Sequence, residues 1–294
     1  MEHDHHEGQR VSRRTALAGF GSIGLGALLA ACSGTESTGA GAAVPSSSAT
    51  TASTDDLAAL FAGAGTCTLT PGTTQGPYYF DADRIRSDIR EDRPGTRLRL
   101  AVRVQDSEAC GPLPDAVVEI WHCDAAGLYS GAESLSSGGG GGGGPGGSAP
   151  PSGAPTGAPP SDGGAGGGAA GGGAGGDLTP QDDKRYLRGA QVTDADGIVR
   201  FTTVWPGWYV GRTVHIHAMV HIDNDRTLTT QLMMDETLNS KVFAQAPYSG
   251  HTGRDTFNQG DSIYRDAMLL KVTEDGDGYL GVITFGVDPD HDGS

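Results

Sequence analysis

The segment "GRTVHIHAMVHI", residues Gly211–Ile222, carries three histidines at steps of two and four residues. In a β-strand, successive side chains alternate between two faces, so His215, His217 and His221 share one face and four apolar residues form the other. This pattern predicts a strand with one core face and one polar face. The His-x-His pair also places two imidazoles within reach of a single metal ion. Half-exposed histidines on an ordinary surface strand would have the same spacing, so the pair alone leaves both interpretations open.

Strand patterns extend over the rest of the chain. Arg97–Gln105 alternates strictly between apolar and polar residues, which is typical of a half-buried strand. Further strands are expected at Ala116–Cys123, Val199–Trp205, Val214–Asp223, Thr227–Met234, Met268–Thr273 and Tyr279–Val287. Asp194–Gly197 and Asp275–Gly278 are predicted turns and not calcium loops, because Trp205 and Gly286 stand where a twelve-residue loop needs a carboxylate. Many short strands and few helical stretches predict an all-β fold, a β-sandwich.

Residues 1–31 have the features of an export signal. Arg13 and Arg14 precede a mildly apolar run that ends in Leu29-Ala30-Ala31-Cys32, and paired arginines indicate the twin-arginine route. The alternative, an uncleaved membrane helix, would need ~20 apolar residues, and this run is shorter and rich in glycine. The box ending in Cys32 resembles a bacterial lipoprotein signal. It implies lipidation of Cys32 and an exported protein that is lipid-anchored to the membrane outside the cytoplasm.

Two low-complexity stretches define the expected domain organisation. Residues 32–65 are mostly small and polar, and they are interpreted as a flexible tether. Residues 138–176 contain 21 glycines in 39 residues and are predicted to form a disordered insertion. Neither flank of this insertion is long enough to form the whole fold alone, so residues 66–290 are predicted to form one β-sandwich domain.

The charge of the chain limits its partners. The formal net charge is −16, and residues 1–31 contain three acidic and three basic side chains, so their removal leaves this value unchanged. Such an acidic body is not expected to bind nucleic acid or an anionic surface.

Three cysteines follow the lipidation box. Export into an oxidising compartment favours a disulfide, and Cys67 and Cys110 both lie in loop-like sequence, so they are predicted to pair. Cys123 falls within a strand pattern and is expected to be a buried free thiol. The alternative, in which all three cysteines are reduced, remains open at this point.

Two tyrosines near the ends of predicted strands could complete a metal site with the histidine pair. Tyr129 lies near the end of the segment "VEIWHCDAAGLYSG", and Tyr209 lies six residues before His215. The commoner role of a tyrosine is amphipathic packing with a satisfied hydroxyl. However, a phenolate is a hard anionic ligand that favours ferric iron. Two phenolates and two imidazoles together predict Fe(III) held without haem.

Four motifs, in this order along the chain, resemble those of the intradiol ring-cleavage dioxygenases, the family of protocatechuate 3,4-dioxygenase and catechol 1,2-dioxygenase. They are "TQGPYYFD", "VEIWHCDAAGLYSG", "PGWYVGRTVHIH" and "LTTQL". Apart from the glycine-rich insertion, the resemblance extends from about Thr66 to Val287. The family fold is a β-sandwich, in agreement with the strand pattern.

The resemblance also implies a reaction and the residues that perform it. The expected reaction is cleavage of a catechol-type ring by O2, between the two hydroxyl-bearing carbons, to a muconate-type diacid. The implied Fe(III) ligands are Tyr129, Tyr209, His215 and His217. The implied catalytic residues are Arg212, which stabilises negative charge, Tyr209, which leaves the metal and accepts a proton, and Gln231. The implied substrate contacts are Thr74, Gly76, Pro77 and Tyr78.

The sequence also departs from the family pattern. The segment between Tyr209 and Arg212 is much shorter than in the catechol and protocatechuate enzymes, and the helical dimerisation domain of the catechol enzymes has no counterpart before Cys67. The identity of the catechol, and whether copies of the chain form a homo-oligomer, therefore stay open.

Two other functions fit parts of this pattern. The cupins also use His-x-His on a β-fold, but the glutamate that should follow it is missing at positions 221–223. A lipid-anchored β-sandwich that binds an aromatic compound or a metal without turnover is the second alternative. A binding module of this kind would need neither Arg212 nor the full set of four ligands.

Overall fold

A computed structural model describes residues 54–62, 67–137 and 177–290. The predicted signal, most of the predicted tether and the glycine-rich insertion lie outside the described residues. The end of the predicted flexible tether that is described, Thr54–Ala62, forms a helix. Within the described part of the chain, no helix has the length and apolar character needed to cross a membrane.

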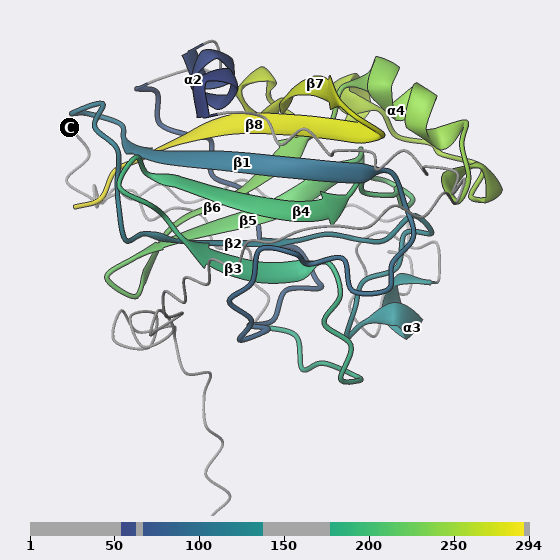
Figure 1. The fold of residues 1–294 in the computed structure, drawn as a ribbon. Coiled ribbons are helices and arrows are strands. Elements are labelled where there is room, and N and C mark those ends of the chain that lie inside the picture. Colours follow the sequence, from purple (N-terminus) through teal and green to yellow (C-terminus); the bar gives the residue numbers. More distant parts are fainter. Residues whose placement is uncertain (1–53, 63–66, 138–176, 291–294) are drawn as a thin grey trace, which may run out of the picture.

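The described chain forms a sandwich of two four-stranded sheets (Figure 1). Sheet A has the order β4-β1-β8-β7, and sheet B has the order β3-β2-β5-β6. Neighbouring strands are antiparallel except for β1 and β8, which run parallel. The strands are β1 (Arg97–Asp106), β2 (Val117–Trp121), β3 (Arg188–Val192), β4 (Ile198–Val204), β5 (His215–Ile222), β6 (Asp225–Met233), β7 (Lys271–Asp275) and β8 (Gly278–Val287). This arrangement confirms the predicted all-β class.

The core lies between the two sheets and follows the alternation of the sequence. On β1, Leu98 and Val102 are fully buried, and Ile216 and Val220 of β5 face them from sheet B within one apolar cluster. Because alternate side chains point to opposite faces of a strand, these residues bury one face of each sheet together. Burial of this apolar area is the main stabilising contribution to the sandwich.

The helices are few and short. They are α2 (Thr54–Ala62), α3 (Glu133–Ser136) and α4 (Glu236–Phe243), with 3₁₀ turns at Tyr248–Gly250, Asn258–Gly260 and Asp266–Met268. Asp235 caps α4, since its side chain accepts a hydrogen bond from the backbone N–H of Leu238. Leu57 and Phe61 of α2 pack on the outer face of sheet A, above β8 in Figure 1.

The cysteines adopt the predicted states. Cys67 and Cys110 form a disulfide with a Cα–Cα distance of 5.0 Å. Of the cysteines that the structure describes, Cys123 is unpaired and buried. Burial raises the pKa of its thiol, so this cysteine stays protonated and has the character of a core residue.

The histidine face of β5 is not that of an ordinary surface strand. Half-exposed histidines were the alternative to a metal site, but His215 is only 2% exposed and His217 only 1%. Loops of the chain cover this outer face of sheet B, and Met219 of the same face packs with Trp121 and Tyr129. The imidazoles therefore lie in a second buried region, separate from the core between the sheets.

Candidate functional site

The four side chains predicted as metal ligands lie together on the outer face of sheet B. Oη of Tyr209 lies 3.1 Å from Nε2 of His215, and this nitrogen lies 3.2 Å from Nε2 of His217. The ring centroid of Tyr129 lies 5.9 Å from that of Tyr209 and 6.2 Å from that of His217. The four side chains thus form a closed ring. Donor atoms that share one metal ion at about 2 Å lie about 3 Å apart, which fits the two measured distances.

The hydroxyl of Tyr129 provides a test of whether this group suits a cation. Tyr129 is fully buried, and its Oη makes no hydrogen bond to any residue that the structure describes. Burial is the main reason that the pKa of this phenol is raised well above its ordinary value. A buried polar atom without a partner is costly, and a metal cation would both satisfy this oxygen and favour its phenolate form. The donor set therefore fits a hard cation.

His215 is held as a neutral ligand. Its Nδ1 lies 2.6 Å from the carbonyl oxygen of Thr213. Since a carbonyl only accepts hydrogen bonds, Nδ1 carries the proton and Nε2 keeps a free electron pair directed at Tyr209 and His217. Burial, with the nearby Arg212 guanidinium, lowers the pKa of His215 to about 3. A backbone carbonyl in this role is the usual outer partner of a metal-binding imidazole.

His217 is oriented by packing. Trp121 lies on β2 opposite His217, and the two rings stack with centroids 5.0 Å apart and an interplanar angle of 5°. The backbone of Gly76 covers another part of the imidazole, because a Cβ at this position would lie only 2.9 Å from Cε1 of His217. Gly76 also has φ of +73°, which favours glycine. Burial holds the pKa of His217 well below its ordinary value, so this imidazole is also neutral.

A tight turn after β2 brings Tyr129 beside Tyr209. The carboxylate of Asp124 accepts hydrogen bonds from the backbone N–H groups of Ala126 and Leu128 and closes this turn. Gly127 has φ of +83°, and a Cβ there would lie 2.6 Å from the carbonyl oxygen of Trp208. Only glycine lets the turn approach the segment that carries Tyr209 this closely.

Arg188 fixes the loops on both sides of Tyr129. This arginine is 1% exposed, and its Nη2 donates to the carbonyl oxygens of Tyr78 and Ser130 at 2.7 and 3.0 Å. Its guanidinium also lies 4.0 Å from the ring centroid of Phe80. Burial lowers the pKa of Arg188 to about 10, which still leaves it charged at neutral pH. Arg188 thereby connects the candidate ligand loop with the loop predicted to contact substrate.

Arg212 and Gln231 lie together beside the ring of four ligands. Gln231 on β6 is the direct strand partner of His217. Its Oε1 accepts a hydrogen bond of 2.5 Å from Nη2 of Arg212. Nε of Arg212 donates to Asp261 at 2.9 Å, so the guanidinium is held at two points. The structure thus places both predicted catalytic side chains next to the candidate metal ligands.

The four predicted substrate contacts occupy one loop, and the structure relates two of them to the site. Gly76 lies against His217, as described above. The Tyr78 ring lies 4.7 Å from that of Tyr129. Thr74 and Pro77 are exposed. Substrate contact at these four positions stays a prediction.

Two further histidines have structural surroundings. His122 is 1% exposed and hydrogen-bonds through its two ring nitrogens to Cys123 O and Thr203 Oγ1. His221 lies beyond a register shift of β5, with Nε2 at 3.8 Å from a Glu119 carboxylate oxygen.

Several residues of the site were not identified from the sequence, among them Trp121, Thr213 and Asp261. Trp121 and Thr213 stand inside the quoted motifs, but neither chain spacing nor residue type showed which ring or backbone group they would support. Asp261 lies 49 residues after Arg212 in an irregular segment. A turn aspartate of this kind carries no signal in a single sequence.

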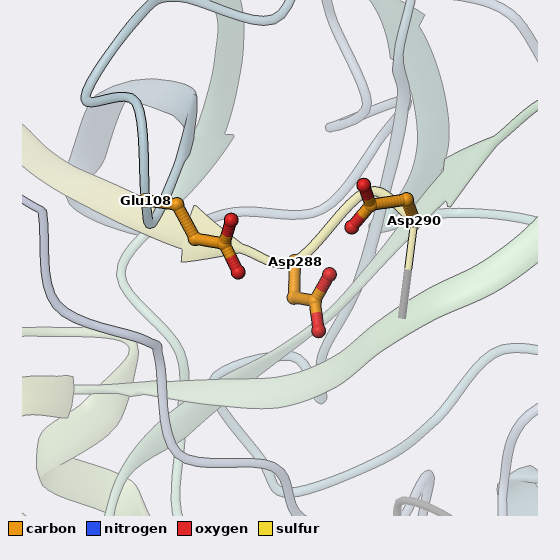
Figure 2. Close-up of side chains that lie close together, drawn as sticks. All are labelled: Glu108, Asp288 and Asp290. Carbon is orange, nitrogen blue, oxygen red and sulfur yellow. The ribbon is translucent and has the colours of Figure 1, made fainter. Parts of the chain in front are cut away.

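A separate acidic cluster lies at the end of β8 (Figure 2). Carboxylate oxygens of Glu108, Asp288 and Asp290 lie within 4.8 Å of one another. Two of these residues are exposed and the third is partly buried. Exposed acidic groups are common without a metal, and no second observation indicates a ligand here, so we assign no function to this cluster.

Comparison with known proteins gives matches among solved structures. No protein-family model and no curated protein matches the sequence. An intradiol ring-cleavage dioxygenase from Tetranychus urticae is 28% identical, with a TM-score of 0.61 and coverage of 76% of this chain and 97% of that chain. A second solved dioxygenase is also 28% identical, with a TM-score of 0.60 and coverage of 76% and 96%. A dioxygenase domain from Streptomyces sp. SirexAA-E is 22% identical, with a TM-score of 0.49 and coverage of 75% and 99%.

The first two similarities extend over almost the full length of the matched proteins. They agree with the order of the four sequence motifs and with the observed sandwich. The chain therefore shares the fold of the intradiol ring-cleavage dioxygenases, the family that its sequence motifs resemble.

Proposed function

We propose that this chain is a non-haem Fe(III) intradiol dioxygenase, which cleaves a catechol-type aromatic ring with O2 to a muconate-type diacid. The observation that carries the proposal is the closed ring of two tyrosines and two neutral histidines, with a fixed arginine and glutamine beside it. The similarity in fold to ring-cleavage dioxygenases supports the same general chemistry.

The iron would be held by Tyr129, Tyr209, His215 and His217. Phenolate oxygens are hard anionic donors, which favour a ferric ion, and neutral imidazoles complete the donor set. When bound, Fe(III) would supply a Lewis-acidic centre that holds a doubly deprotonated catechol and makes its ring reactive toward O2.

Tyr209 is the residue that we assign to accept a catechol proton. It is partly exposed, whereas Tyr129 is fully buried, so an incoming ligand reaches Tyr209 first. Burial raises the pKa of the Tyr209 phenol well above its ordinary value. A phenolate at this position therefore takes up a proton readily once it is free of a cation.

Arg212 is assigned to stabilise negative charge that develops on the substrate. Its side chain is 19% exposed and is held by Gln231 and Asp261. A fixed cation in a site that is largely sheltered from water needs little reorganisation when charge appears, and this makes its stabilising effect large.

The test of this function uses iron-loaded protein and the variant Tyr209→Phe. Wild type should show a burgundy phenolate-to-Fe(III) band and consume O2 with a catechol while a diacid forms. Tyr209→Phe should keep its iron, shift the visible band and lower kcat by about 100-fold or more, the usual loss for a proton-transfer group. Iron content, the absorption spectrum and O2 uptake measure these effects.

Tyr264→Phe is the matched control, since Tyr264 contacts Asp266 outside the site and should tolerate the change. Full activity of the Tyr209→Phe variant would show that Tyr209 is not needed to accept a catechol proton. Coloured wild-type protein that cleaves none of a panel of catechols would instead favour the non-catalytic binding protein. Protein without iron or a visible band would contradict the ligand set.

We further propose that the mature protein is a lipid-anchored, extracytoplasmic enzyme exported folded with its iron in place. The proposal is motivated by the sequence Arg13-Arg14 followed by Leu29-Ala30-Ala31-Cys32. Wild type should fractionate with membranes, and Cys32→Ser should remain unprocessed and without lipid. Wild-type protein found wholly in the cytosol with residues 1–31 intact would refute export and leave the iron chemistry unaffected.

A further inference from the structure

Asp261 contacts Nε of Arg212, whereas Gln231 is contacted by Nη2 of the same guanidinium. Oδ2 of Asp261 accepts hydrogen bonds from Nε of Arg212 at 2.9 Å and from the backbone N–H of Thr213 at 2.8 Å. Its Oδ1 accepts from the backbone N–H of Ile263 at 2.8 Å, and the carboxylate side chain is 1% exposed. Burial alone would raise the pKa of Asp261, but the two backbone N–H groups and the guanidinium outweigh it and lower the pKa.

Thr213, the second partner of Asp261, lies between the candidate catalytic arginine and a candidate metal ligand. Its N–H donates to Asp261, and its carbonyl oxygen accepts the Nδ1–H of His215. Its hydroxyl donates to Oδ1 of Asn258 at 2.6 Å. The peptide units on both sides of Thr213 are therefore fixed, and one carboxylate holds the guanidinium of Arg212 together with the backbone that orients His215.

We propose that Asp261 is a positioning residue of the ring-cleavage reaction, an inference that rests on the proposed function. An unconstrained arginine side chain loses rotamer entropy when it is fixed. The contact with Asp261 restricts that freedom before substrate arrives and directs Nη2 toward Gln231 beside the ligands. Asp261 is not one of the four candidate ligands, and it acts on the reaction through Arg212, which it holds.

A double-mutant cycle on iron-loaded protein tests this role. Asp261→Asn should retain iron and lower kcat by about 10- to 100-fold, the loss typical of an outer-shell partner. In an Arg212→Ala background the same change should add little, because the arginine that Asp261 positions is already gone. Equal losses in both backgrounds would overturn a role exerted through Arg212.

Asp194→Asn is the matched control. Asp194 also accepts backbone N–H groups in a turn, from Asp196 and Ile198, and pairs with an arginine, Arg200, at 2.8 Å. This turn connects β3 to β4, away from the four ligands. The control should therefore lose a carboxylate–arginine contact without a change in kcat.

A second readout needs no turnover. In metal-free protein, the Nε–H of Arg212 should give an NMR signal that is protected from solvent exchange in wild type and in Asp194→Asn, but not in Asp261→Asn. Unchanged protection in Asp261→Asn would overturn the inference. If wild type cleaves no catechol, the proposed function fails, and this signal still decides whether Asp261 holds Arg212.

Discussion

His217→Ala should give a folded protein that has lost its iron and its ring-cleavage activity. The change removes one of four proposed ligands from a position where its Nε2 lies 3.2 Å from that of His215. Alanine offers no donor, and Trp121 and the backbone of Gly76, which flank this ring, offer no metal ligand in its place. We expect iron affinity to fall by well over 10-fold, measured as iron per chain after dialysis together with the visible band.

His122→Ala is the matched control for this experiment. His122 is as buried as His217, and burial lowers its pKa to about 4, so both are neutral core imidazoles. It hydrogen-bonds to Thr203 and lies outside the ring of four ligands. His122→Ala should therefore lose stability but keep iron. Wild-type iron content in His217→Ala would exclude His217 as a ligand, and equal iron loss in both variants would indicate general destabilisation.

The alternation of apolar and polar residues predicted most strands of the sandwich, because each strand must bury its apolar face. Arg97–Gln105 was predicted as a strand and forms β1 at Arg97–Asp106. β3 was missed, since "RGAQV" at Arg188–Val192 has no alternation and begins with a buried arginine and a glycine. The strand expected at Met268–Thr273 begins only at Lys271, because Asp266–Met268 forms a 3₁₀ turn first.

The sequence predicted the four candidate ligands and their neighbours Arg212 and Gln231, but not the surroundings that orient them. Tyrosine and histidine side chains together indicate a site for a hard metal cation, and the order of the motifs implied which of these residues are the ligands. Their surroundings come from distant parts of the chain, such as Arg188, which reaches Tyr78 across 110 residues. Tertiary contacts of this kind leave no periodic pattern in the sequence. The burial of the histidine face of β5 could not be predicted for the same reason. The alternation of residues within a strand does not show whether loops from elsewhere in the chain cover one of its faces.

Trp121→Ala should lower the free energy of unfolding by about 3–5 kcal/mol, the usual cost of truncating a buried tryptophan. Trp121 is 0% exposed, stacks on His217 and packs on the Tyr79 ring at 4.7 Å. Because no described residue accepts a hydrogen bond from Nδ1 of His217, the indole is the main constraint on the imidazole plane. Loss of the indole should therefore also weaken iron binding by about 10-fold or more.

Trp205→Ala separates these two effects, because Trp205 is equally buried but belongs to the core between the sheets. Its Nε1 donates to Asn239 at 3.0 Å, and its ring packs on Tyr279 and not on a candidate ligand. Urea unfolding of the metal-free proteins should show similar destabilisation of both variants. Only Trp121→Ala should shift the visible band and release iron, and the milder Trp121→Phe should restore part of the affinity through its own ring. If Trp205→Ala released as much iron as Trp121→Ala, the loss would follow from stability, and stacking would have no specific role in orienting His217.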